Sequence, residues 1–123
     1  MLLDFHKVWG YVAIVANGLA GLYALAAWRW KGLRGKPVWA ATIFAEAAIL
    51  LQVLVGVLLV SAQHFKPPRF HMFYGFVAFI TVGLLYSYKY VWKARGWMEL
   101  AYGLGGLFIM GLGIRAILQV TAS

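Results

Sequence analysis

Residues 38–62 read VWAATIFAEAAILLQVLVGVLLVSA, a stretch of 25 positions in which Glu46 is the only charged side chain. A helix that crosses the hydrocarbon core of a membrane needs about 20 consecutive, mostly apolar residues, whereas apolar runs of about 10–14 residues are more typical of buried helices. The length and composition of this stretch therefore predict a membrane-spanning helix.

Three further apolar stretches flank it, at 6–28, 70–90 and 98–119. The four stretches are separated by short polar segments, namely RWKGLRGKP (29–37), QHFKPPR (63–69) and KYVWKARGW (89–97). Connections this short place consecutive helices antiparallel to one another. The sequence therefore predicts an all-α fold with a single domain over residues 1–123, an integral membrane four-helix bundle.

The overall composition supports lipid as the surrounding medium. Charged residues make up 11% of the chain and hydrophobic residues 64%, whereas about a quarter of a soluble domain is charged. The net charge of +8 lies in short clusters between apolar runs and not along a stacking surface, so nucleic acid is not an expected partner. The absence of cysteine excludes disulfides and thiolate chemistry.

The distribution of Lys and Arg predicts the orientation. Loops 29–37 and 89–97 carry seven of these residues, and the opposite side carries four, which are Lys7, Lys66, Arg69 and Arg115. Cytoplasmic loops carry the excess, so both termini are expected outside the cytoplasm. The strong positive charge follows the first apolar stretch, which is unlike a cleaved signal peptide, and the first helix is expected to be retained.

The chain also resembles itself at an offset of 65 residues. Residues 5–19 read FHKVWGYVAIVANGL and residues 70–84 read FHMFYGFVAFITVGL. Seven of these 15 positions are identical: Phe5/Phe70, His6/His71, Gly10/Gly75, Val12/Val77, Ala13/Ala78, Gly18/Gly83 and Leu19/Leu84. We interpret this as a duplicated helical hairpin, with repeats at about 5–62 and 70–119 related by an axis along the membrane normal.

This symmetry would make the first and third helices diagonal neighbours, so that His6 and His71 face each other at equal depth. A b-type haem needs two axial nitrogens, small residues beside its ring and cations near its propionates. The residues that could supply these are His6, His71, Gly10, Gly75, Arg69, Lys66 and Arg115. A zinc or copper site formed by His6, His64 and His71 is a second possibility. A third is that the histidines only cap helices or form hydrogen bonds across the bundle.

Glu46 lies well inside its predicted span, where an ionisable residue is a functional candidate. It could relay protons or bind a cation, and Asn17 and Gln52 could belong to the same polar network. The alternative, which the sequence favours, is a protonated Glu with a structural role. At the ends of the helices, Asp4 is the expected partner of Arg115, and Glu99 is expected to meet Lys or Arg of the third loop.

The last span contains a glycine ridge that permits close helix packing, formed by Gly103, Gly106, Gly111 and Gly113. The packing partner could lie within this chain or in another protein. Only three acidic residues are present and they differ in depth, so no acid–base constellation of an enzyme is evident. We therefore expect a non-enzymatic protein.

The stretch HMFYGF (71–76) and the closing GLFIMGLGIRA (106–116) resemble those of small, functionally unassigned four-helix membrane proteins of bacteria such as actinobacteria. The resemblance implies a bacterial plasma membrane and supplies no activity. The leading hypothesis is an accessory subunit of a larger membrane complex or a homo-oligomer. The alternatives are an electron-transfer protein with haem b between His6 and His71, and a small-ion or proton pathway through Glu46.

Overall fold

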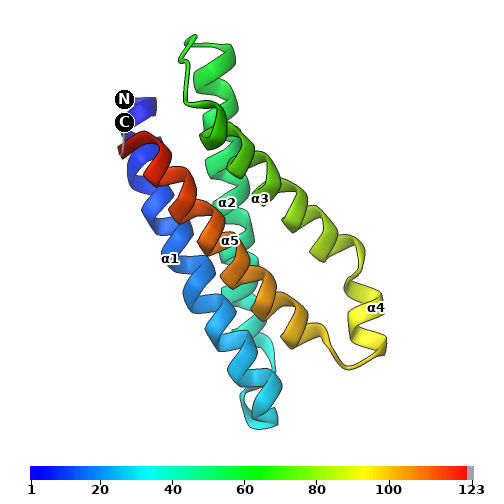
Figure 1. Cartoon of the computed structure of the whole chain (residues 1–123). Helices are drawn as coiled ribbons and strands as arrows, with labels where there is room; N and C mark the ends of the chain where they lie inside the picture. Colours follow the sequence, from blue (N-terminus) through cyan, green and yellow to red (C-terminus); the bar gives the residue numbers. More distant parts are fainter. Residues whose placement is uncertain (122–123) are drawn as a thin grey trace.

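The computed structural model describes residues 1–121, which form helices and their connections without any strand (Figure 1). In chain order the elements are α1 (Leu2–Arg29), the short 3-10 helix η1 (Lys31–Leu33), α2 (Lys36–Ser61), α3 (Arg69–Ser87), α4 (Lys89–Ala94) and α5 (Met98–Thr121). Four of these helices, α1, α2, α3 and α5, are long and apolar enough to cross a membrane. The four predicted long helices are therefore confirmed.

The ends of the helices differ from the predicted ranges by more than two residues at two places. Helix α1 begins at Leu2 and not at residue 6, and Asp4 in its first turn interacts favourably with the positive end of the helix dipole. Helix α3 ends at Ser87 and not at residue 90, because the backbone leaves the helical conformation at Tyr88 (φ −100°, ψ 11°). The chain continues as the separate short helix α4. Pro37 lies in the first turn of α2, where its missing N–H costs no hydrogen bond.

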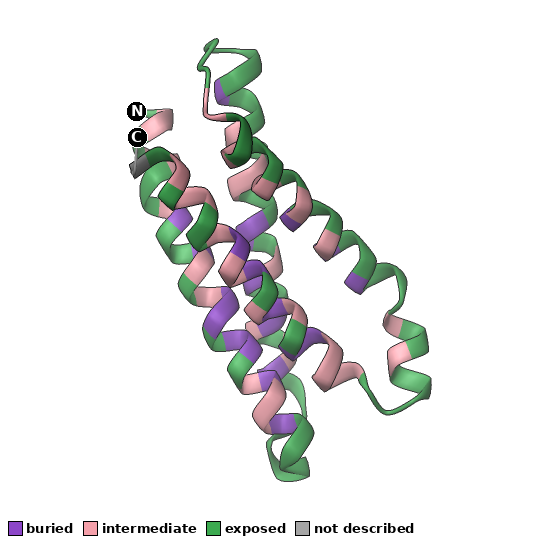
Figure 2. Ribbon diagram, viewed as in Figure 1, coloured by how far each residue is buried: buried purple, intermediate pink, exposed green. Residues whose placement is uncertain are grey.

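Helix α1 is the centre of the packing. It packs against both α2 and α5, whereas α3 packs mainly against α5 and touches α2 over only a short length. In the most apolar 18-residue window of each helix, 50% of the residues are buried in α1 but only 11% in α3. Figure 2 shows the corresponding concentration of buried positions where α1, α2 and α5 meet. Helix α3 thus leaves most of its surface uncovered by the rest of the chain.

The contact between α1 and α5 depends on glycine. A Cβ atom on Gly106 would lie 2.8 Å from Asn17 O and 3.0 Å from Gly21 Cα, and one on Gly21 would lie 2.8 Å from Gly103 O. Backbone atoms thus approach backbone atoms, which only residues without a side chain allow. Gly113 similarly lies against Ile14 of α1. Most of the predicted glycine ridge is therefore used within the chain, and only Gly111 has open space beside it.

We call the end of the molecule formed by residues 29–37 and 88–97 the basic end. Arg34 stabilises this end through hydrogen bonds and an ion pair. Its guanidinium donates to the carbonyl oxygens of Ala27 (2.8 Å) and Trp28 (2.9 Å), two of the carbonyls that the end of a helix leaves without a partner. Its Nε also lies 3.5 Å from Glu99 Oε1. The prediction that Glu99 pairs with a basic residue of the third loop is thus wrong, because Arg34 of the first loop lies beside the start of α5.

Candidate functional site

The structure brings His6 of α1 and His71 of α3 together at the end of the molecule opposite the basic end, which we call the histidine end. Their ring centres are 6.1 Å apart and the ring planes are inclined by 70°. His6 lies in the second turn of α1, since that helix begins at Leu2, and His71 lies in the first turn of α3. Both side chains are partly buried. Two helices that do not pack directly against each other along their length therefore meet through their imidazoles.

The two imidazoles differ in their hydrogen bonds. His71 Nδ1 lies 2.8 Å from Ala116 O. Because a carbonyl oxygen can only accept, this nitrogen carries the hydrogen and Nε2 keeps a free lone pair. A backbone carbonyl that orients the second nitrogen in this way is a common arrangement around metal-binding histidines. The His71 ring is thus held in place with one nitrogen available.

His6 has no such partner. Its Nδ1 is buried and forms no hydrogen bond with any residue that the structure describes. The backbone at His6 is nevertheless fixed, because Gln52 Nε2 donates to His6 O at 2.7 Å. The ring also packs against Gly56, where an added Cβ would lie 3.2 Å from His6 Cε1. A buried polar atom without a partner is uncommon in a native protein and calls for an explanation, such as a bound ion or water.

The spacing of the two rings discriminates between explanations. A direct N–H···N hydrogen bond of about 2.9 Å would bring the ring centres to about 5 Å. Because metal–imidazole bonds are about 2.0–2.1 Å long and a ring nitrogen lies roughly 1.1 Å from the ring centre, two imidazoles on opposite sides of one ion have centres about 6.3 Å apart, whereas two ligands of a tetrahedral zinc ion have centres about 5 Å apart. The observed 6.1 Å is too long for a direct hydrogen bond or a shared tetrahedral ion and lies near the value for two imidazoles on opposite sides of one ion.

The other residues of the predicted haem site are arranged less favourably. The space beside Gly10 is filled by Gln52, whose Nε2 would lie 2.8 Å from an added Cβ, whereas the space beside Gly75 is open. The cationic side chains of Lys66, Arg69 and Arg115 are exposed. The expected partnership of Arg115 with Asp4 is wrong, since no ion pair joins them within residues 1–121.

His64 does not join the other two histidines. It is exposed, in the loop between α2 and α3, with a positive φ of 59°. No group of three His, Cys, Asp or Glu side chains in the described part of the chain is arranged to hold a metal ion. The three-histidine metal site, one of the possibilities left open by the sequence, is therefore not formed within the described residues.

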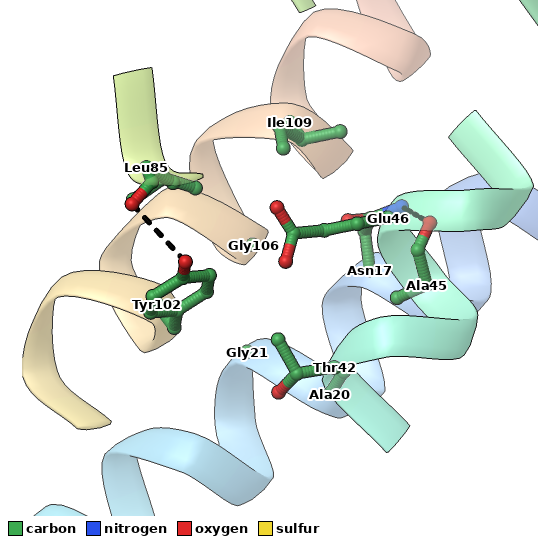
Figure 3. Close-up of a pocket in the computed structure, with 10 residues that line it drawn as sticks. All are labelled: Asn17, Ala20, Gly21, Thr42, Ala45, Glu46, Leu85, Tyr102, Gly106 and Ile109. Atoms are coloured by element: carbon green, nitrogen blue, oxygen red, sulfur yellow. Dashed lines mark hydrogen bonds between the residues drawn. The ribbon is translucent and has the colours of Figure 1, made fainter. Parts of the chain in front are cut away.

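A second polar cluster lies in the centre of the bundle, around Glu46 of α2. Glu46 lines a small cavity of about 10 Å³ together with three other polar side chains, Asn17, Thr42 and Tyr102. Figure 3 shows the Glu46 carboxyl group directed towards Gly106 and Tyr102 of α5. Asn17, Thr42 and Tyr102 are buried, with exposed fractions of 1%, 5% and 7%. We call these four polar residues the central cluster.

The sequence identified this cluster only in part. Asn17 lies beside Glu46 as expected, but Gln52 does not, because it binds the backbone of His6. Thr42 precedes Glu46 by one helical turn, and this spacing alone could have indicated it. Tyr102 comes from another helix, so its place depended on how α5 is rotated, for which the apolar pattern gives no signal.

Comparison of the chain with protein-family models, curated proteins and solved structures gives no match.

Proposed function

We propose that this chain is a small, non-enzymatic, multi-pass protein of the bacterial plasma membrane, and that it carries a b-type haem between His6 and His71 through which it transfers electrons. One observation carries the proposal. The His6 imidazole has a buried nitrogen without a partner among the described residues. Its ring centre lies 6.1 Å from that of His71, whose ring is oriented by a backbone carbonyl. Such a pair supplies two axial nitrogens, the ligand set of many electron-transfer haems.

The residues around the pair limit where a porphyrin would lie. Gln52 fills the space beside Gly10, so the room for the ring is on the side of Gly75, where nothing lies within 4 Å of an added Cβ. Arg69 and Arg115 would serve the propionates. When bound, the haem supplies one-electron chemistry, and the chain itself supplies the axial ligands and their orientation.

In the proposed topology the histidine end and both termini face outwards, since the basic end carries the excess of Lys and Arg that marks the cytoplasmic side. The proposed duplication is supported by a repeated ring contact. Phe5 and Trp9 stack with centres 5.6 Å apart and planes inclined by 32°, and their counterparts Phe70 and Tyr74 do so at 6.5 Å and 33°.

The proposal also includes a membrane-protein partner, because an electron carrier needs a donor and an acceptor. It places the chain as a subunit of a larger membrane assembly, with much of α3 uncovered beside His71. The mass of the native complex, extracted gently from the membrane, tests this part. A mass equal to one chain and its detergent under every mild extraction would remove the partner from the proposal.

An absorption spectrum tests the haem. Protein purified after growth with ample haem should show a Soret band, and His6→Ala and His71→Ala should each abolish it. His64→Ala is the matched control, because His64 is an exposed loop residue, and it should leave the band intact. Absence of the band in the folded wild-type protein would refute the haem assignment, and stoichiometric zinc or copper in that protein would identify a bare metal ion in its place.

A further inference from the structure

The central cluster has an unusual hydrogen-bond inventory, because its neutral side chains have no polar hydrogen left for Glu46. Asn17 Nδ2 donates to Ala13 O (2.8 Å) and to Ala45 O (3.0 Å). The hydroxyl of Thr42 donates to Val38 O (2.9 Å) and that of Tyr102 donates to Leu85 O (3.1 Å). An amide has two N–H hydrogens and a hydroxyl has one, so every donor is used by a backbone carbonyl.

The atoms that remain are all acceptors. Asn17 Oδ1 and the lone pairs of Tyr102 Oη can receive a hydrogen bond but cannot give one. No hydrogen bond of Glu46 to a described residue is present, and within residues 1–121 the ion pair Arg34–Glu99 lies at the basic end and not here. Glu46 is half-buried within the chain, and in the middle of a membrane span its ionised form would be a carboxylate with neither donor nor counter-ion among the described residues, which is very unfavourable.

A bound proton or metal cation would compensate the charge of Glu46, which lacks both a hydrogen-bond donor and a counter-ion in the described part of the chain. A proton on the carboxyl group removes its charge and turns Glu46 into the donor that the acceptors around it lack. The cavity of about 10 Å³ holds no more than about one water molecule, so a hydrated metal ion does not fit. From these two facts we propose that the central cluster is a proton-binding site within the membrane span, in which Glu46 carries the proton and Asn17 and Tyr102 accept from it.

The surroundings of the site leave few other titratable groups. Helix α1 contributes Asn17, Ala20 and Gly21, helix α3 contributes only Leu85, and helix α5 contributes Tyr102 as its one titratable residue. Tyr86 of α3 is a further neighbour of Tyr102. Leu85 is thus the one side chain that lines the cavity from α3, the helix that is least covered by the rest of the chain.

A carbodiimide that dissolves in the membrane tests the site, because it adds to the protonated form of a carboxyl group. Wild-type protein in lipid nanodiscs should be labelled on Glu46 at neutral pH, as read from the mass of its peptide, and Glu46→Gln should abolish this label. Glu99 is the internal control, since it pairs with Arg34 and should stay unlabelled. Leu85→Ala should speed the labelling of Glu46 several-fold, because it opens the cavity and keeps the carbonyl that Tyr102 uses.

Two results would overturn the inference. One is the absence of a label on Glu46 in the folded Leu85→Ala variant, in which access is not limiting. The other is protection of Glu46 by sodium chloride but not by choline chloride at constant pH, which would assign the site to sodium instead. The inference does not rest on haem binding: the Glu46 label and the Soret band are separate readouts, and either can fail while the other holds.

Discussion

Replacing Gly106 by Ala tests whether the fold depends on backbone contact between α1 and α5. The added methyl carbon would lie 2.8 Å from Asn17 O and 3.0 Å from Gly21 Cα. Carbon atoms in contact are about 3.5–4.0 Å apart, and neither neighbour is a side chain that can rotate away. The two helices must therefore separate by roughly 0.5–0.7 Å, which costs a sizeable part of the dispersion energy along their contact.

Overpacking of this kind destabilises a protein by about 1–3 kcal/mol, which corresponds to a roughly 5–150-fold shift in the unfolding equilibrium. Gly111→Ala on the same helix is the matched control, because nothing lies within 4 Å of its added Cβ. Since both changes replace a helical Gly by Ala, the difference between the variants removes the helix-propensity gain, which is about 1 kcal/mol.

Reversible unfolding in mixed micelles with increasing denaturing detergent, followed by circular dichroism and tryptophan fluorescence, measures this difference. Gly106→Ala should unfold at a clearly lower detergent fraction than Gly111→Ala. Equal stability of the two variants would refute the argument, because it would mean that α1 and α5 do not approach as closely as described.

Two further predictions concern the two ends of the molecule. Arg34→Ala should lower the free energy of unfolding by about 1–2 kcal/mol in the same assay, because two helix-end carbonyls lose a charged donor. Glu99→Gln should cost less than about 1 kcal/mol, since the Arg34 side chain is 33% exposed and solvent weakens such a pair; a larger loss in Glu99→Gln than in Arg34→Ala would contradict this ranking. Gly56→Ala should weaken the proposed haem binding, because its Cβ would lie 3.2 Å from His6 Cε1 and the ring must turn. The Soret absorbance per chain measures that effect, and full occupancy in this variant would show that the packing of His6 on Gly56 is not required.

Much of the arrangement was predictable because hydropathy and charge are local properties of the chain. The four long helices and their connections follow from apolar runs and from proline and charged segments. The meeting of His6 and His71 was foreseen from the offset of 65 residues in the sequence, since equal positions on two helices that run in the same direction lie at similar depth. The presence of Glu46 inside a long apolar helix is also evident from the sequence alone.

The predictions that are wrong concern the rotation of side chains about the helix axes, the placement of loops and the end of α3, which hydropathy does not encode. The sequence suggests Gln52 as a neighbour of Glu46, but residues six positions apart on a helix point in directions about 120° apart. The partner of Glu99 depended on which loop lies under α5, and both loops at that end are basic. The end of α3 at Tyr88 is not evident from the sequence, because the aromatic residues that follow continue the apolar run.

The contact made by Arg34 has a consequence for how the chain is assembled. Arg34 follows α1 directly in the sequence, so the donor for the carbonyls of Ala27 and Trp28 is available as soon as the first helix has been synthesised. Its acidic partner, Glu99, is more than 60 positions further along. During synthesis the first helix can thus be completed early, whereas the salt bridge forms only after the start of the last helix has been synthesised.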